Sequence, residues 1–322
     1  MRRTRWLVLA AISFLVIAVG STYFGRVALQ KKDAPRAPRP LPPGIDATAE
    51  NWHFRKTDGN KPVAEISAKS SRQIKEPSQF ELTGVELHLF HKDGGEYDQI
   101  KSDKAEFDIA NGIMYSDGDV EITMGVPADQ PPNGRLLKIK SSGVTFETKT
   151  GKASTDRMAA FTFQKGDGTA VGAEYDPNTG ELHMKSQVEL HWKGKTPDTK
   201  PMTIESGEAV YKEREAKVYL MPWSRLRRDT LTLDAGPAVV TLEDNVIRQV
   251  ETTAAHGVQN DPDRKVEYKA DQLHVELDED GVITKITGEQ NARLVETAAT
   301  AQTTVTCDRV DLNFDAAQKD ST

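Results

Sequence analysis

The chain has 322 residues and a formal net charge of −7, with 37% hydrophobic and 28% charged residues. Acidic and basic residues are interleaved, so the sequence lacks the basic stripe that a nucleic-acid partner requires, and we predict no such partner. The low apolar content, with a mean hydropathy of −0.57, is typical of a thin β-structure in which each strand has one wet face. Cys307 is the single cysteine, which excludes an internal disulfide and a cysteine-based zinc site.

The N-terminal segment has the pattern of a membrane anchor. Residues 1–5 include three arginines, and residues 6–24 form an apolar stretch without a charge. Such a stretch, as a helix, spans about 28 Å, close to the hydrocarbon thickness of a bilayer. We predict a cytoplasmic tail (1–5) and a transmembrane helix (6–24). The alternative is a cleaved signal peptide, for which Ala18, Val19 and Gly20 offer the one small-x-small site.

A proline-rich segment follows the apolar stretch. Residues 34–43 contain five prolines. Such a run prefers the extended polyproline II conformation, which makes it a semi-rigid spacer. We therefore predict a linker over residues 25–47 that holds the folded part away from the membrane.

From residue 51 onward, apolar residues alternate with period two, as in half-buried strands. The alternation changes phase repeatedly, first at Gly84 and then after small residues spaced 29 to 39 positions apart. A one-residue change of register turns every side chain to the other face, unless the backbone bends there. We therefore predict bent strands, with two facing layers and aliphatic inner faces. The predicted bends lie at Ser102, Ser141, Ala170, Ser206, Ala235, Ala270 and Cys307.

Turn signals separate these strands. Asn111-Gly112, residues 177–180 (PNTG) and Asp280-Gly281 each stand between two alternating segments. Asn-Gly and Asp-Gly favour tight turns between antiparallel strands. Each unit is therefore predicted to be a bent strand, a turn and a returning strand.

Residues 100–122 (IKSDKAEFDIANGIMYSDGDVEI) combine a bent strand, an Asn-Gly turn and a Gly-Asp-Val return. This segment, within residues 80–124, resembles the LptC/OstA family of lipopolysaccharide-transport proteins. The single predicted anchor without a cytoplasmic domain is similar to the LptC branch. The resemblance implies an all-β fold, an elongated, V-shaped antiparallel β-jellyroll behind one transmembrane helix, with acyl chains in its cleft. It implies no catalytic residue and no cofactor.

The resemblance also implies partners and a location. The chain is expected to sit in the inner membrane by a single span, with its bulk in the periplasm. It is expected to accept lipopolysaccharide from an inner-membrane ABC transporter and to pass it to an LptA-like bridge protein. Because the chain is longer than one LptC jellyroll, we predict either two modules, residues 48–195 and 196–322, or one extended module.

The inward-facing aliphatic residues are the candidates for a lipid groove. On composition alone they form an ordinary closed core, whereas the resemblance favours a groove. Alkyl chains need only apolar walls, with a gain of about 0.8 kcal/mol per buried CH₂. The candidates are Leu82, Val85, Leu87, Phe107, Ile109, Ile122, Ile139 and Phe146.

Two clusters of polar residues have alternative readings. His88, His91 and Asp93 suggest a metal site, but strand positions three apart face opposite sides, so we predict no metal there. Arg225, Arg227 and Arg228, close to Trp223, interrupt the alternation and are predicted to lie in a loop. That loop either contacts lipid phosphates or is simply solvated.

Two other functions compete with lipid transport. A structural or carbohydrate-binding β-solenoid predicts aromatic residues on an outer face, but aromatic residues make up only 7% of the chain. A β-helical polysaccharide lyase or hydrolase predicts clustered carboxylates, which the sequence does not show, so we predict no enzyme. Residues 304–314 (TVTCDRVDLNF) are predicted to form a last strand with an open edge, free to pair with a partner protein.

Overall fold

The computed structural model describes residues 48–59, 61–75, 78–91, 95–128, 137–163, 166–193, 200–243, 246–279 and 281–313. The predicted tail, transmembrane helix and linker, residues 1–47, lie outside the described residues. Among the residues that are described, no helix is long and apolar enough to cross a membrane.

The described chain is an antiparallel sheet of 17 strands, which confirms the all-β prediction and is consistent with a β-jellyroll. One short 3₁₀ helix, η1 (Glu213–Glu215), connects two of the strands. The strands are β1 (Thr48–Asp58), β2 (Lys61–Lys75), β3 (Gln79–Phe90), β4 (Glu96–Asp108), β5 (Ile113–Pro127), β6 (Leu137–Glu147), β7 (Ala153–Phe163), β8 (Gly166–Asp176), β9 (Glu181–Trp192), β10 (Met202–Lys212), β11 (Lys217–Arg228), β12 (Leu231–Ala235), β13 (Ala238–Glu243), β14 (Val246–Asn260), β15 (Arg264–Leu277), β16 (Ile283–Ala298) and β17 (Gln302–Asn313).

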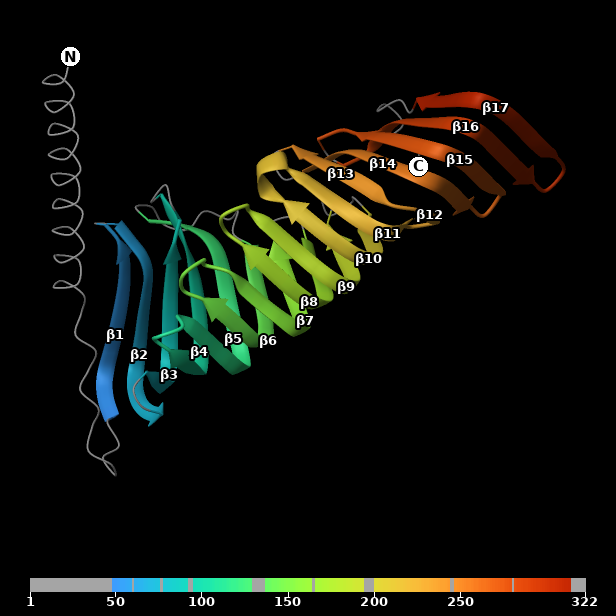
Figure 1. Cartoon of the computed structure of the whole chain (residues 1–322). Helices are drawn as coiled ribbons and strands as arrows, with labels where there is room; N and C mark the ends of the chain where they lie inside the picture. The colour runs from blue at the N-terminus through green and yellow to red at the C-terminus, as the bar shows by residue number, and fades with distance from the viewer. Residues whose placement is uncertain are drawn as a thin grey trace, which may run out of the picture. The chain divides into compact units, whose positions relative to one another are not determined.

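Each strand except β12 pairs with the next one along the chain, so the sheet is a continuous meander (Figure 1). Strands β12 and β13 share one place in it, because both pair with β11 on one side and with β14 on the other. The predicted turn at Asn111-Gly112 joins β4 to β5, and the predicted turn at 177–180 joins β8 to β9. Within the described chain, β1 and β17 each pair with a single neighbour.

The strands bend where the sequence predicts. The register shifts next to Ser102, between Lys140 and Thr145, and next to Ser206. The other four positions agree with the prediction. The pairing register of β8 shifts beside Ala170, and β12 ends at Ala235, before β13 begins. One bulge follows Ala270, and another lies opposite Cys307. Gly84 adopts a φ of +61° at such a bend, a conformation that favours glycine.

Hydroxyl groups satisfy carbonyls that the bulges remove from the sheet ladder. The Ser102 and Ser116 hydroxyls both donate to the carbonyl of Lys104, at 2.9 Å. The Ser206 hydroxyl lies 2.7 Å from the carbonyl of Glu208, and the Thr155 hydroxyl donates to Ser142 at 2.8 Å. A buried carbonyl without a hydrogen-bond partner costs folding free energy. The serines and the threonine at the bends therefore act in two ways: their small side chains fit the bend, and their hydroxyls bond the carbonyls that the bulge leaves unpaired.

The sheet rolls so that strands distant in its order face one another. The rings of Phe54 on β1 and Phe107 on β4 lie 5.2 Å apart, and those of Trp52 and Phe107 lie 6.1 Å apart. Three strand steps in a flat sheet would separate β1 from β4 by about 14 Å. The inner faces of the rolled sheet therefore pack against each other as a common apolar interior.

One polar contact also crosses this interior. The Lys56 ammonium of β1 donates to the carbonyl of Thr148 at 3.2 Å, although Thr148 lies in the turn between β6 and β7. Burial and the nearby Lys149 lower the pKa of Lys56. The first strand is thus tied across the interior as well as to β2.

The apolar interior continues through β9 and β10. Val188 and Met184 of β9 belong to the same buried cluster as Met202 and Ile204 of β10. The two strands pair from Met202–Trp192 to Lys212–Glu181, so sheet and interior both continue across the predicted boundary at residues 195 and 196. The division into two modules stays a prediction.

Candidate functional site: the apolar interior and its cavity

All eight groove candidates face the interior, and seven are buried. Phe107, Phe146, Leu82 and Leu87 are at most 1% exposed. Ile109 directly follows β4 and packs, partly buried, against the same cluster. Strand alternation places them there, because residues two apart share a face. They form a packed core in this structure, and their contact with lipid stays a prediction.

A cavity lies further along the interior, between β10 and β16. Its volume is about 50 Å³. A water molecule needs roughly 10–15 Å³, so the space holds a few waters and admits an alkyl chain only if its walls move apart. The apolar walls include Met202, Ile204, Leu220, Leu226, Leu231, Leu233, Ala235, Ala238, Val240, Ile247, Val250, Val275, Leu277, Ile283 and Ile286.

The size of the side chains explains where the interior is full and where it is hollow. Phe54, Phe80, Phe107, Phe146 and Phe161 fill the part built by β1 to β7. Residues 164–313 contain no phenylalanine, so β8 to β17 fill the interior mostly with aliphatic side chains. A second, smaller cluster of five buried residues, including Leu233 and Leu273, forms there. A loosely filled interior is the part of the molecule that best accommodates an added apolar chain.

The predicted arginine loop is wrong. Arg225, Arg227 and Arg228 lie on β11, which continues through Pro222 because Pro222 and Trp223 form a bulge opposite Gly207 of β10. Arg225 pairs with Asp234 and Glu205, and Arg227 with Glu205 at 3.0 Å.

Only two of the three arginines line the cavity, Arg225 and Arg228. Arg228 donates to the carbonyl of Gly281 at 3.0 Å. Trp223, in the bulge, is 44% exposed. The pattern break in the sequence thus marks a bulge and not a loop.

Tyr268 lines the same cavity from β15, and burial raises its pKa to about 12. An ordinary tyrosine has a pKa near 10. Because the pKa of Tyr268 is higher in the folded chain than in the unfolded chain, the contribution of this residue to folding stability is fully present below pH 10. That contribution is lost as the pH rises through 12. We expect Tyr268→Phe to lack this alkaline loss while changing stability at pH 7 by less than about 0.5 kcal/mol. Urea unfolding between pH 7 and 11.5 checks this, and equal slopes in both proteins would contradict it.

The histidines sit apart in local polar contacts. His88 pairs with Glu86 at 3.0 Å, and His91 with the buried Asp98 at 3.1 Å. Asp93 lies outside the described residues. No group of three or more metal-ligating side chains occurs in the described part of the chain.

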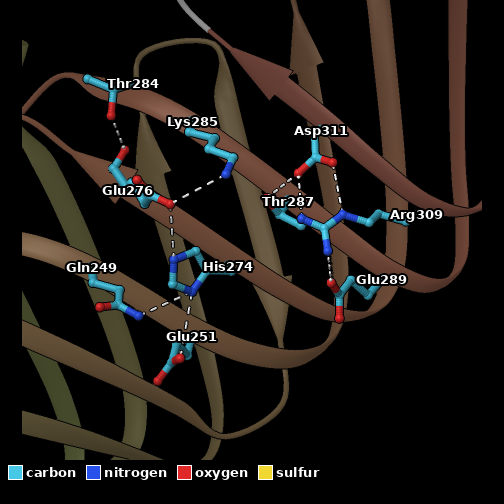
Figure 2. A network of polar contacts seen from close by, with 10 residues as sticks. All are labelled: Gln249, Glu251, His274, Glu276, Thr284, Lys285, Thr287, Glu289, Arg309 and Asp311. Atoms are coloured by element: carbon cyan, nitrogen blue, oxygen red, sulfur yellow. Dashed lines mark hydrogen bonds and ion pairs between the residues drawn. The ribbon is translucent and has the colours of Figure 1, made fainter.

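The outer face of the last strands carries charged and polar groups (Figure 2). His274 lies between Glu251 and Glu276, at 3.6 and 3.5 Å. Arg309 on β17 and the Thr287 hydroxyl on β16 hold the pKa of Asp311 at about 2, well below its usual range. The side of β14 to β17 that faces away from the cavity is therefore polar, in contrast to the apolar interior.

The sequence matches the family described as "Lipopolysaccharide-assembly, LptC-related" over residues 10–193, more than half of the chain. The chain belongs to the LptC family. Its membership supports a role in lipopolysaccharide transport. None of the curated proteins compared with the chain matches it.

The LptC match ends at the last residues of β9, so it includes all eight groove candidates and excludes the cavity. Sequence reasoning missed the cavity as a site. The absence of phenylalanine from residues 164–313 is the available signal, since it reduces the side-chain volume that fills the interior.

Proposed function

We propose that this LptC-family chain is a periplasmic, inner-membrane-anchored component of lipopolysaccharide export that carries acyl chains within its rolled sheet. The single observation that supports it best is the continuous apolar interior of β2 to β14, of which the part from β2 to β9 lies in the segment matched by the LptC family. An acyl chain gains about 0.8 kcal/mol for each CH₂ moved from water to such surroundings. Transfer along the interior requires no catalytic group.

Site-specific photocrosslinking tests the proposal. A diazirine analogue of leucine at the inward Ile139, which is 5% exposed, is expected to label lipopolysaccharide in cells. The same analogue at the neighbouring outward Lys138 is the matched control and is expected to label little, because adjacent strand residues face opposite sides. Equal labelling at both positions would contradict an interior lipid path.

We further propose the partners that the resemblance implies: an inner-membrane ABC transporter at the β1 end and an LptA-like bridge at the β17 end. Strand β17 contains no proline, most of its side chains are exposed, and it pairs only with β16 within the described chain. An open edge of this kind can accept a strand from another protein. The membrane helix predicted for residues 6–24 and the linker predicted for residues 25–47 would hold β1 near the transporter.

Proline substitutions at two adjacent positions test the β17 edge. Successive N–H groups of a strand point to alternate sides, so Thr304→Pro and Val305→Pro remove one donor toward β16 and one toward the open edge. Both side chains are exposed. We expect one variant to lose binding to the bridge protein with little change in its melting temperature. Wild-type binding by both variants, measured by pull-down of the purified partner, would rule out edge pairing.

A further inference from the structure

We propose that the cavity between β10 and β16 is a second lipid site that holds one alkyl chain and places its acidic headgroup against Arg228. This inference rests on the proposed function, because both take the interior of the sheet as the place where acyl chains bind. It goes beyond that function because the cavity lies outside the segment matched by the LptC family.

The walls of the cavity suit a single alkyl chain. Strands β10 to β16 supply aliphatic side chains almost throughout, with Ser224 and Thr252 as the small polar exceptions. Both hydroxyls already donate to backbone carbonyls, Ser224 to Gly236 and Thr252 to Pro237, each at 3.0 Å. The cavity surface that a ligand would contact is therefore apolar, and an alkyl chain needs no polar group along its length to bind there.

Arg228, at the cavity, is a positive charge without an acidic partner among the described residues. Of the three neighbouring arginines, Arg225 and Arg227 pair with carboxylates, whereas Arg228 bonds to the neutral carbonyl of Gly281. No carboxylate among the described residues lies within ion-pair distance of Arg228. A guanidinium binds a phosphate by two parallel, charge-assisted hydrogen bonds, which are stronger than its bond to a neutral carbonyl. Charge complementarity therefore selects a ligand with an acidic headgroup.

Headgroup binding is coupled to opening of the cavity. Gly281 lies in the turn between β15 and β16, at least three strand steps from β11 in the order of the sheet. The Arg228–Gly281 bond thus ties two walls of the rolled sheet together. A phosphate that replaces this carbonyl as the partner of the guanidinium breaks the Arg228–Gly281 bond, and the two walls are then free to move apart around an alkyl chain.

A lipid headgroup and a free anion can both present a phosphate to Arg228, so the experiment uses ligands that distinguish these two sources. The full-length chain is kept in glyco-diosgenin, a detergent without an alkyl chain, and carries a diazirine leucine at position 233 in the cavity wall. Dodecyl phosphate is the ligand, and the yield of labelling gives its half-saturation concentration. Dodecanol and inorganic phosphate are the competitors that carry only the chain or only the anion.

Arg228→Gln is the decisive variant and Arg227→Gln its matched control. Both lose one positive charge from β11, but only Arg228 lines the cavity. We expect Arg228→Gln to raise the half-saturation concentration by about tenfold or more, the effect of losing a charge-assisted bond, and Arg227→Gln to change it less than about twofold. Inorganic phosphate is expected not to compete at the concentrations that saturate dodecyl phosphate.

A second variant fills the cavity without touching the arginine. Ala235→Phe places a ring among the lining residues and is expected to abolish labelling, while its melting temperature reports whether the sheet still folds. Equal effects of Arg227→Gln and Arg228→Gln would overturn the headgroup assignment. Competition by inorganic phosphate would show a free-anion site instead.

The outcome separates this inference from the proposed function. Labelling from position 139 without labelling from position 233 would overturn the second site and leave the LptC-family interior as the lipid path. Labelling from position 233 without labelling from position 139 would support the second site and contradict a lipid path through the LptC-matched part of the interior.

Discussion

Replacement of Phe107 by Asp is expected to destabilise the folded sheet by more than about 5 kcal/mol. Removal of a buried phenylalanine side chain costs about 3–5 kcal/mol, and a carboxylate without a partner adds several more. Phe107 is 1% exposed and contacts the rings of Trp52 and Phe54 from the first strand. The substitution therefore breaks the contact that rolls β1 over β4.

Urea unfolding of the full chain, followed by far-UV circular dichroism, measures the effect. Glu106→Lys is the control, because the neighbouring side chain points to solvent and its replacement is expected to cost less than about 0.5 kcal/mol. The result also decides between a closed core and an open groove in β2 to β7. If Phe107→Asp keeps a nearly wild-type midpoint, water reaches this position and the interior there is open.

Replacement of Gly257 by Ala is expected to cost about 1–3 kcal/mol, the usual penalty of overpacking. Gly257 pairs with Tyr268 on the neighbouring strand, and a Cβ atom at position 257 would lie 1.9 Å from the ring carbon that carries the hydroxyl. Two further ring carbons would lie at 2.3 Å. The tyrosine ring must leave its place on the cavity wall to admit the methyl group.

A double-mutant cycle identifies the cause. If the ring is responsible, Gly257→Ala combined with Tyr268→Ala is less destabilising than the sum of the two single changes, by about 1–3 kcal/mol. Gly118→Ala is the control, since nothing lies within 4 Å of its Cβ position. Strict additivity in the cycle would show that the backbone, and not the ring, rejects the side chain at position 257.

Much of the sheet was predictable because strand alternation is strict. The phase changes at Ser102, Ser206 and Ala270 predicted bends that the structure confirms, since a buried face tolerates no change of register without a bulge. The groove candidates are inward-facing for the same reason. The LptC/OstA resemblance was confirmed by the family match.

The remaining features depend on contacts between segments that are far apart in the chain. Whether an inward phenylalanine is buried or borders a hollow depends on the strand that rolls over it, as Phe54 does over Phe107. Alternation also cannot distinguish a loop from a bulge, and for this reason Arg225 to Arg228 were wrongly predicted to form a loop. The carbonyl partners of the serines at the bends are set by the bulge geometry itself.

The pairing of β9 with β10 within one chain determines how this part of the sheet responds to protein concentration. Two sheets that meet as separate proteins come apart on dilution, whereas β9 and β10 belong to one chain and face each other at a fixed effective concentration. The joint between the LptC-matched part and the C-terminal strands therefore has no dissociation constant, and its stoichiometry is always one to one. The proposed contacts at the outer edges of β1 and β17 would instead depend on the concentration of the partner, so a shortage of partner would affect the ends of the sheet and not the pairing of β9 with β10.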